Sequence, residues 1–116
     1  MSKENCIFCK IIEGVIPAKK LYEDDDFIII EDIEPKAKVH CLAIPKSHYA
    51  LLADMTESDA QILGKIMAKL PKAIEDKLGL TRGYRLVINQ GGDAGQTVFH
   101  LHIHIVGGQV MGFSPA

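Results

Sequence analysis

The sequence lacks the long apolar stretches and the leader-like start that membrane and secreted proteins require. Its longest wholly apolar runs, such as residues 27–30, fall far below the ~18 residues of a membrane-spanning helix. Residues 1–5 are mostly polar, and Cys9, Lys10 and Glu13 interrupt the apolar stretch that follows, which is not the pattern of a signal peptide. We therefore expect a cytoplasmic protein that contacts no membrane.

The sequence also lacks an excess of basic residues. Its 13 lysines and arginines are set against 15 aspartates and glutamates, which gives a formal net charge of -2 at pH 7. A chain of this charge has no general attraction for a nucleic-acid backbone, and no nucleic-acid partner is expected. Any phosphate group that it binds must be held by a local arrangement of donors.

Repeats, low-complexity tracts and linkers are missing from the 116 residues, of which 47% are hydrophobic. This length suffices for one ordinary hydrophobic core and is too short for two. We expect a single domain that covers residues 1–116.

Cysteine is scarce, with three residues. Thiols stay reduced in the cytoplasm, so a disulfide framework is not expected, and Cys41 is interpreted as a core residue. Cys6 and Cys9 form a C-x-x-C pair, the spacing of half a zinc site or of a redox-active thiol pair. The redox interpretation requires a preceding strand, and only five residues precede Cys6. The pair therefore favours a metal.

Apolar residues at helical spacing predict two helices. A short helix is expected at residues 7–12, with Asn5 as its N-cap and Gly14 at its end. The capping pattern at Thr56 begins one long helix, in which Pro71 should cause a kink because it has no amide donor.

Stretches rich in β-branched residues and bounded by turn residues predict five strands. They are expected at residues 20–23, 27–32, 39–44, 84–89 and 98–106. Short turns between strands, together with one long and one short helix, predict an α+β fold with a mainly antiparallel five-stranded sheet.

His100, His102 and His104 alternate with aliphatic residues within residues 99–106. Because side chains alternate along a strand, this pattern sends all three imidazoles to one face. Two kinds of chemistry fit such a stripe. The imidazoles can be metal ligands, or they can supply a nucleophile, phosphate donors and proton transfer.

A glycine-rich segment leads directly into the histidine stripe. Glycines within residues 91–95 let backbone amides approach an anion closely, and Gln96 and Thr97 add further donors. His40, in the predicted strand at 39–44, is placed to reach the same site from a neighbouring strand. These neighbours favour phosphate chemistry.

Residues 95–106, Gly-Gln-Thr-Val-Phe-His-Leu-His-Ile-His-Ile-Val, resemble the signature of the histidine triad (HIT) family. Residues 6–17, 32–48 and 89–108 resemble the Hint branch of that family in order and spacing, so the resemblance covers nearly the whole chain. The pair Gly107-Gly108 also looks like Hint rather than the dinucleoside-polyphosphate branch.

The resemblance implies a HIT-like α+β homodimer that binds purine nucleotides such as AMP. Its expected activity is hydrolysis of nucleoside phosphoramidates, such as an adenosine phosphoramidate, or related adenylyl compounds. His102 would attack the α-phosphorus to form a nucleotidyl-histidine that water cleaves, with no metal in this step. His104 and His40 would contact the phosphate. Thr97 and the backbone of Gly95-Gln96 would stabilise developing charge.

The resemblance also implies a nucleotide pocket and a structural zinc site of the kind found in bacterial relatives. Asn89 would orient nearby groups, and Asp32 would accept hydrogen bonds from the ribose hydroxyls. The apolar residues of the base pocket would be Ile7, Phe8, Ile11, Ile30 and Ile33. The zinc ligands would be Cys6, Cys9, His48 and His100.

At residues 112–115, Gly-Phe-Ser-Pro replaces a segment that in eukaryotic Hint proteins carries a tryptophan reaching the partner's active site. The resemblance therefore does not define the preferred substrate or base. Two other interpretations stay open. One is a nucleotide-binding regulatory protein with little turnover, and the other is a metal-dependent hydrolase that uses the three triad histidines as ligands.

Overall fold

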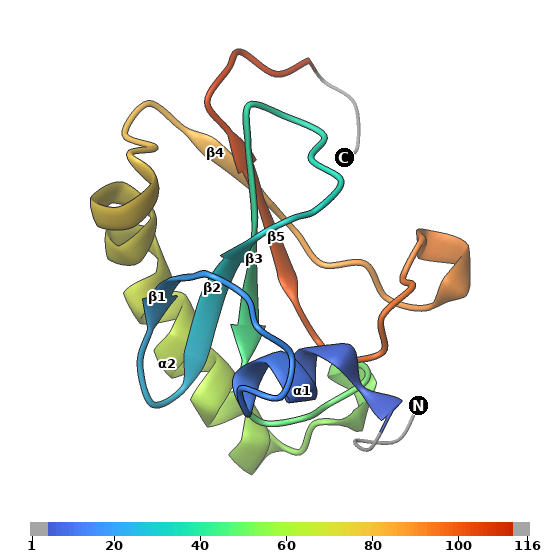
Figure 1. The fold of residues 1–116 in the computed structure, drawn as a ribbon. Helices are drawn as coiled ribbons and strands as arrows, with labels where there is room; N and C mark the ends of the chain where they lie inside the picture. The colour runs from blue at the N-terminus through green and yellow to red at the C-terminus, as the bar shows by residue number, and fades with distance from the viewer. Residues whose placement is uncertain (1–4, 113–116) are drawn as a thin grey trace.

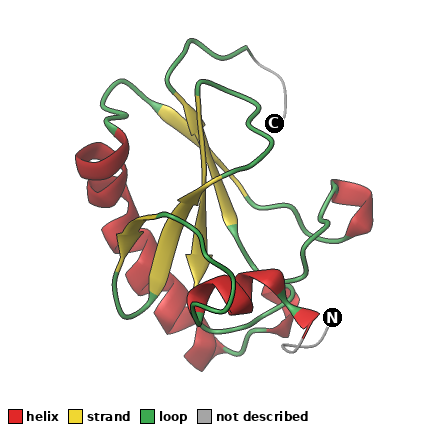
Figure 2. Ribbon diagram, in the orientation of Figure 1, coloured by secondary structure: helices red, strands yellow, loops and turns green. Residues whose placement is uncertain are grey.

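The computed structural model describes residues 5–112, which form a five-stranded antiparallel sheet with helices on both faces (Figures 1 and 2). The strand order is β1-β2-β3-β5-β4. The strands are β1 (Lys20–Glu23), β2 (Phe27–Glu31), β3 (Val39–Pro45), β4 (Tyr84–Val87) and β5 (Ile103–Gly107). The predicted α+β class and the antiparallel sheet are confirmed.

The long helix α2 (Glu57–Ala73) packs on one face of the sheet. Its capping box is the predicted one, because the Thr56 hydroxyl accepts the backbone N–H of Asp59 and the Asp59 carboxylate accepts the N–H of Thr56. Pro71, where a kink was expected, lies inside α2, which continues to Ala73. The π-helical turns of η3 (Ile74–Leu78) follow directly. Within the described residues, no helix has the length and apolarity to cross a bilayer.

The short helix α1 (Ile7–Ile12) covers the other face of the sheet. Alternation along β2 divides its side chains, since Phe27 and Ile29 contact the α2 core while Ile28 and Ile30 contact the α1 core. The expected N-cap of α1 was wrong by one residue. Cys6, rather than Asn5, has the extended backbone of a cap, and its Sγ accepts the Cys9 N–H at 3.2 Å.

The last two strands are shorter than expected. β5 begins at Ile103 rather than at residue 98, and β4 ends at Val87 rather than at residue 89. Before β5, backbone groups bond to loops instead of a neighbouring strand: the Leu101 N–H donates to the Tyr49 carbonyl at 2.6 Å. His100 therefore precedes the strand and has no partner residue in the sheet register.

Candidate functional site

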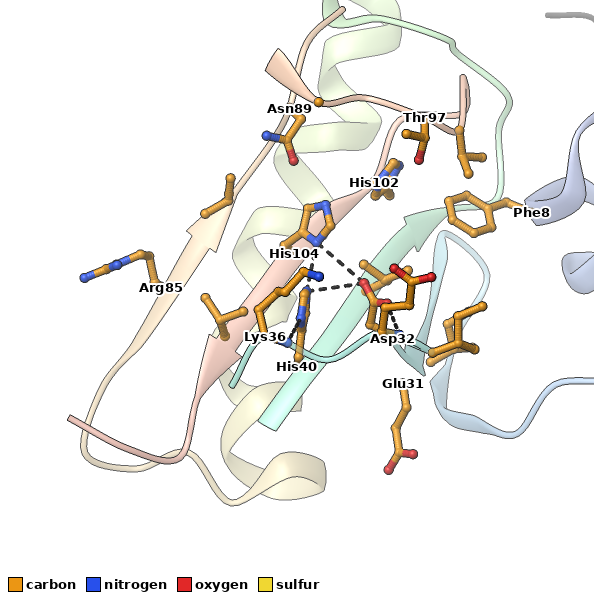
Figure 3. A pocket seen from close by; sticks show the side chains of 18 of the residues that line it. Phe8, Glu31, Asp32, Lys36, His40, Arg85, Asn89, Thr97, His102 and His104 are labelled. Atoms are coloured by element: carbon orange, nitrogen blue, oxygen red, sulfur yellow. Dashed lines mark hydrogen bonds and ion pairs between the residues drawn. The ribbon is translucent and has the colours of Figure 1, made fainter. Parts of the chain in front are cut away.

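A cavity of about 830 Å³ lies on the α1 face of the sheet, close to the ends of β2 and β3 and beside β5 and β4 (Figure 3). Twelve of the residues singled out in the sequence line it. They are Ile7, Phe8, Ile11, Ile30, Asp32, Ile33, His40, Asn89, Gly95, Thr97, His102 and His104. The volume falls within the range of small-molecule sites. The tertiary structure thus brings these residues together around one cavity.

The sheet register brings the imidazoles to this cavity. His104 on β5 lies opposite Leu42 on β3 and Val87 on β4, and all three side chains line the cavity. The His102 and His104 ring centroids are 5.1 Å apart, and the His102 ring is also 5.1 Å from the Phe8 ring of α1. The two histidines therefore share one face, as their alternation predicts.

Hydrogen bonding defines the tautomer of His102. Its Nδ1 lies 2.7 Å from the carbonyl oxygen of His100, and a carbonyl can only accept, so Nδ1 carries the proton. Burial lowers the pKa of His102, although the same hydrogen bond opposes this shift. A neutral ring protonated on Nδ1 has a free electron pair on Nε2. His102 is therefore in the form that a nucleophile requires.

His40, His104 and Asp32 form a second network in the cavity (Figure 3). The Lys36 backbone N–H donates to Nδ1 of His40 at 2.9 Å, which leaves the proton of a neutral His40 on Nε2. That Nε2 lies 2.9 Å from Nδ1 of His104 and 3.3 Å from Oδ2 of Asp32. Burial lowers the pKa of His104, with smaller contributions from His102 and His40.

The position of the proton on His40 decides whether this network can bind a metal ion or donate hydrogen bonds. Asp32, His40 and His104 are close enough together to hold a metal ion. However, a neutral imidazole that accepts a hydrogen bond on Nδ1 keeps its proton on Nε2 and cannot offer Nε2 as a ligand. The arrangement is instead a relay of donors, in which His104 receives a hydrogen bond on Nδ1 and carries its own proton on Nε2.

The four predicted metal ligands converge at the other end of the stripe. Nδ1 of His100 lies 3.3 Å from Sγ of Cys6, 3.5 Å from Sγ of Cys9 and 3.1 Å from Nδ1 of His48. Tetrahedral zinc with two sulfur and two nitrogen ligands has ligand separations of about 3.3 to 3.8 Å, and the separations here lie within a few tenths of an ångström of that range. Cys6, Cys9, His48 and His100 are thus positioned to hold a metal ion, and the donor set is compatible with zinc.

The tautomer of His100 suits that site. Nε2 of His100 donates to the Pro45 carbonyl at 2.7 Å, so its Nδ1 electron pair faces the two sulfurs. Burial lowers the pKa of His100 to about 4, which keeps the ring neutral. Within residues 5–112, two groups of side chains could each hold a metal ion. His100 belongs to the group with the two cysteines, whereas His104 belongs to the group with Asp32. The triad imidazoles therefore do not gather around one point, which argues against the metal-dependent hydrolase.

The glycine-rich loop is built differently from the expectation. Gln96 is buried and does not line the cavity. Its Oε1 accepts the Gly91 N–H at 2.8 Å, and its Nε2 donates to the carbonyls of Ala50 and Val98. Asn89 donates from Nδ2 to the Ala94 carbonyl at 2.8 Å. Gln96 braces the loop, and Asn89 both supports the loop and faces the cavity.

Two basic residues that were not predicted from the sequence, Lys36 and Arg85, also line the cavity (Figure 3). Arg85 lies opposite Val106 on β5, as His40 does from β3, so both project to the same face of the sheet. In the strand predicted at residues 84–89, Arg85 alternates in step with Val87 and Asn89, and this spacing indicates that Arg85 lies on the same face as Asn89. Lys36 lies in an irregular connection, where no periodicity indicates direction.

Comparison with known proteins shows the family of this chain. Residues 5–114 match the family model described as "Scavenger mRNA decapping enzyme C-term binding". The chain is 48% identical over 104 residues to "Protein HitA" of Neisseria gonorrhoeae, covering 90% of this chain and 96% of that protein.

Solved structures show the same likeness in three dimensions. A HIT family hydrolase from Clostridium thermocellum has a TM-score of 0.90 and 51% identity, covering 97% of this chain and 98% of that chain. A histidine triad protein from Clostridium difficile has a TM-score of 0.90 and 39% identity, covering 99% and 100%. Since the match extends over nearly the whole chain and includes the alternating histidines, the protein belongs to the histidine triad (HIT) family.

Proposed function

We propose that this protein binds purine nucleotides and hydrolyses nucleoside phosphoramidates or related adenylyl compounds through a nucleotidyl-histidine intermediate on His102. The observation that carries the proposal is the 2.7 Å hydrogen bond from Nδ1 of His102 to the His100 carbonyl, in a cavity large enough for a nucleotide. The similarity to HIT family hydrolases from Legionella pneumophila and Clostridium thermocellum supports a hydrolytic activity.

The reaction needs one attack and one replacement by water. Nε2 of His102 attacks the α-phosphorus, the P–N bond breaks, and the leaving amine takes a proton from solvent. Water then attacks the same phosphorus and the bond to Nε2 breaks. The water oxygen stays in the nucleoside monophosphate, its proton returns to solvent, and neutral His102 is restored. Neutral His104 carries an Nε2 proton that can donate to a phosphate oxygen, and Thr97 and Gly95 border the same region.

The rest of the cavity suits a nucleoside. The side chains of Ile7, Phe8, Ile11, Ile30 and Ile33 provide an apolar wall for a base. Ile33 is 96% exposed, so a base that covered it would bury apolar surface at little structural cost. Asp32 would accept the ribose hydroxyls. One of its oxygens already accepts the Glu34 N–H, and a carboxylate has about four acceptor positions.

We also propose that Cys6, Cys9, His48 and His100 bind zinc. The ion would be structural and would connect α1 to the segment that precedes β5. A homodimer is also proposed. Strand β4 is an edge of the sheet and carries Arg85 and Val87 of the cavity wall. An edge strand offers free backbone groups for pairing with a second copy.

A substrate panel tests the proposed activity. Pure protein is assayed with adenosine and guanosine phosphoramidates, acyl adenylates and dinucleoside polyphosphates, and rapidly quenched samples are digested for peptide mass spectrometry. We expect turnover of a phosphoramidate or an acyl adenylate and a nucleotidyl adduct on His102. Tight nucleotide binding without turnover of any compound would instead support a regulatory protein, and activity abolished by mild chelation with the adduct absent would support metal-dependent hydrolysis.

A further inference from the structure

His100 connects the metal-ligand cluster to the nucleophile through two short hydrogen bonds. Its ring donates from Nε2 to the Pro45 carbonyl at 2.7 Å, and its own carbonyl accepts from Nδ1 of His102 at 2.7 Å. The ring is fully buried between the two sulfurs and His48. One residue therefore carries a metal ligand on its side chain and the partner of His102 on its main chain.

The backbone around His100 lies outside the sheet, so its orientation depends on side-chain and loop contacts. The segment before β5 is not paired in the sheet, and its direction is held by the Leu101 N–H bond to Tyr49 and by side-chain bonds such as that from Gln96 to the Val98 carbonyl. A carbonyl in such a segment can rotate more easily than one in a strand ladder. Fixing the His100 ring limits that rotation.

The orientation of this carbonyl decides which nitrogen of His102 is nucleophilic. A carbonyl aimed at Nδ1 stabilises the tautomer with its proton on Nδ1 and its electron pair on Nε2. If the carbonyl turned away, the proton could occupy either nitrogen, and part of the population would lose the free electron pair on Nε2.

We propose that His100 is a positioning residue for His102, acting through the metal cluster: ligation of its ring holds its carbonyl against Nδ1 of His102. This inference rests on the proposed function for its kinetic consequence, whereas the tautomer of His102 is a property of the protein alone. A metal site that only stabilised the fold would affect the unfolding temperature and leave both the tautomer and the turnover of folded molecules unchanged.

The test compares two substitutions. One removes the imidazole of His100 but keeps four metal ligands, and the other keeps the imidazole but removes a metal ligand. His100→Cys keeps a complete set of ligands, now three cysteines and His48, which is a donor set found in structural zinc sites. Cys9→Ser removes a ligand and leaves His100 in place. Lys69→Ala is the stability control, because Lys69 pairs with Asp26 at 2.8 Å far from the cavity.

Each protein is analysed for bound zinc, for the His102 tautomer by long-range ¹H–¹⁵N correlation of the imidazoles at alkaline pH, and for kcat and KM. The missing signals of His102→Asn assign the His102 resonances. We expect His100→Cys to keep the Nδ1–H tautomer of His102. We expect Lys69→Ala to keep both that tautomer and a kcat within about threefold of the parent. In Cys9→Ser we expect mixed tautomers and a kcat lower by roughly 10- to 100-fold, with KM changed by about twofold or less.

Two results would overturn the proposal: a metal-free Cys9→Ser protein with the parent tautomer, or a metal-loaded His100→Cys protein without it. If Cys9→Ser does not fold, the metal-loaded His100→Cys protein decides the question by its tautomer. If the parent turns over none of the substrates, the proposed function fails, but the tautomer comparison still tests the role of His100.

Discussion

Nε2 of His40 lies 2.9 Å from Nδ1 of His104, across the neighbouring strands β3 and β5. Because Nδ1 of His40 accepts the Lys36 N–H, the His40 proton points to His104. The backbone amide of Lys36 thereby determines the tautomer of His40, and His40 in turn determines the tautomer of His104. The Nε2 proton of His104 is then available to a bound phosphate.

Removing His40 should therefore weaken catalysis through His104. In His40→Ala the tautomer of His104 loses its fixed partner, and we expect kcat/KM to fall by about 10- to 100-fold, as is usual when an orienting partner is lost. Steady-state kinetics with the best phosphoramidate measure it, with Lys38→Ala as a control on the same connection. Unchanged kinetics in His40→Ala would remove His40 from the site.

Replacing the nucleophile should separate binding from turnover. His102→Asn keeps approximate size and a hydrogen-bonding group but has no attacking nitrogen, so kcat should fall by at least about 10³-fold while nucleotide affinity changes by less than about fivefold. Single-turnover kinetics and AMP titration by calorimetry measure the two quantities. Near-full activity of this variant, or an adduct on His100 or His104 in the parent, contradicts the mechanism.

Ribose recognition by Asp32 should appear as discrimination against 2′,3′-dideoxy nucleotides. A carboxylate that loses its hydroxyl partners is left poorly satisfied, which we expect to weaken binding by about tenfold or more. Asp32→Ala should bind ribo and dideoxy forms equally. Asp32→Ala also removes the 3.3 Å contact to His40, so affinity ratios rather than turnover are the proper readout. Equal affinity of the parent for both forms would exclude Asp32 from ribose binding.

Zinc should co-purify at close to one ion per chain. A zinc ion held by Cys6, Cys9, His48 and His100 would join α1 to the segment before β5, so removing it with a strong chelator should lower the thermal midpoint by several degrees or more. Elemental analysis and calorimetry are the measurements, and restored stability after adding zinc is the control. Free, rapidly titrating thiols at Cys6 and Cys9 in purified protein would show that the assignment is wrong.

An ion-pair network at the β1–β2 turn should make stability depend on acid pH. Burial opposes ionisation of Asp24, but hydrogen bonds from Tyr22, Lys69 and two backbone amides outweigh it and lower its pKa to about 2. A carboxyl with a depressed folded-state pKa stabilises the fold above its unfolded value near 4, and this contribution is lost as the pH falls toward 2.

The contribution of Asp24 should be roughly 1–2 kcal/mol after allowance for solvent screening. Urea unfolding of the parent and of Asp24→Asn across the acid range measures it. We expect the two proteins to differ most above about pH 4 and to converge near pH 2. A constant difference in unfolding free energy at all pH values would show that the charge of Asp24 is not responsible.

Local patterns in the sequence predict the structure best where neighbouring residues decide the outcome. The alternation of His102 and His104 predicted a shared face because side-chain direction repeats every two residues along a strand. The strand expected at 98–106 was wrong in its first half, since the residues before Ile103 use their backbone groups for loop contacts that local patterning does not indicate. Gln96 shows the same limit: a donor beside glycines suggested an anion contact, and its buried amide instead braces the loop.

The sequence by itself determined the five strands, the capped long helix, the C-x-x-C pair and the histidine stripe. These depend on short-range rules: alternation of burial, capping within one turn and ligand spacing on one helix. Only the tertiary structure decided how each imidazole is used. Cys6 and His100 are separated by 94 positions yet lie 3.3 Å apart, and each tautomer depends on which carbonyl or amide a distant segment presents. A hydrogen bond requires an angstrom-scale placement of two groups, and that placement exists only when the sheet has assembled.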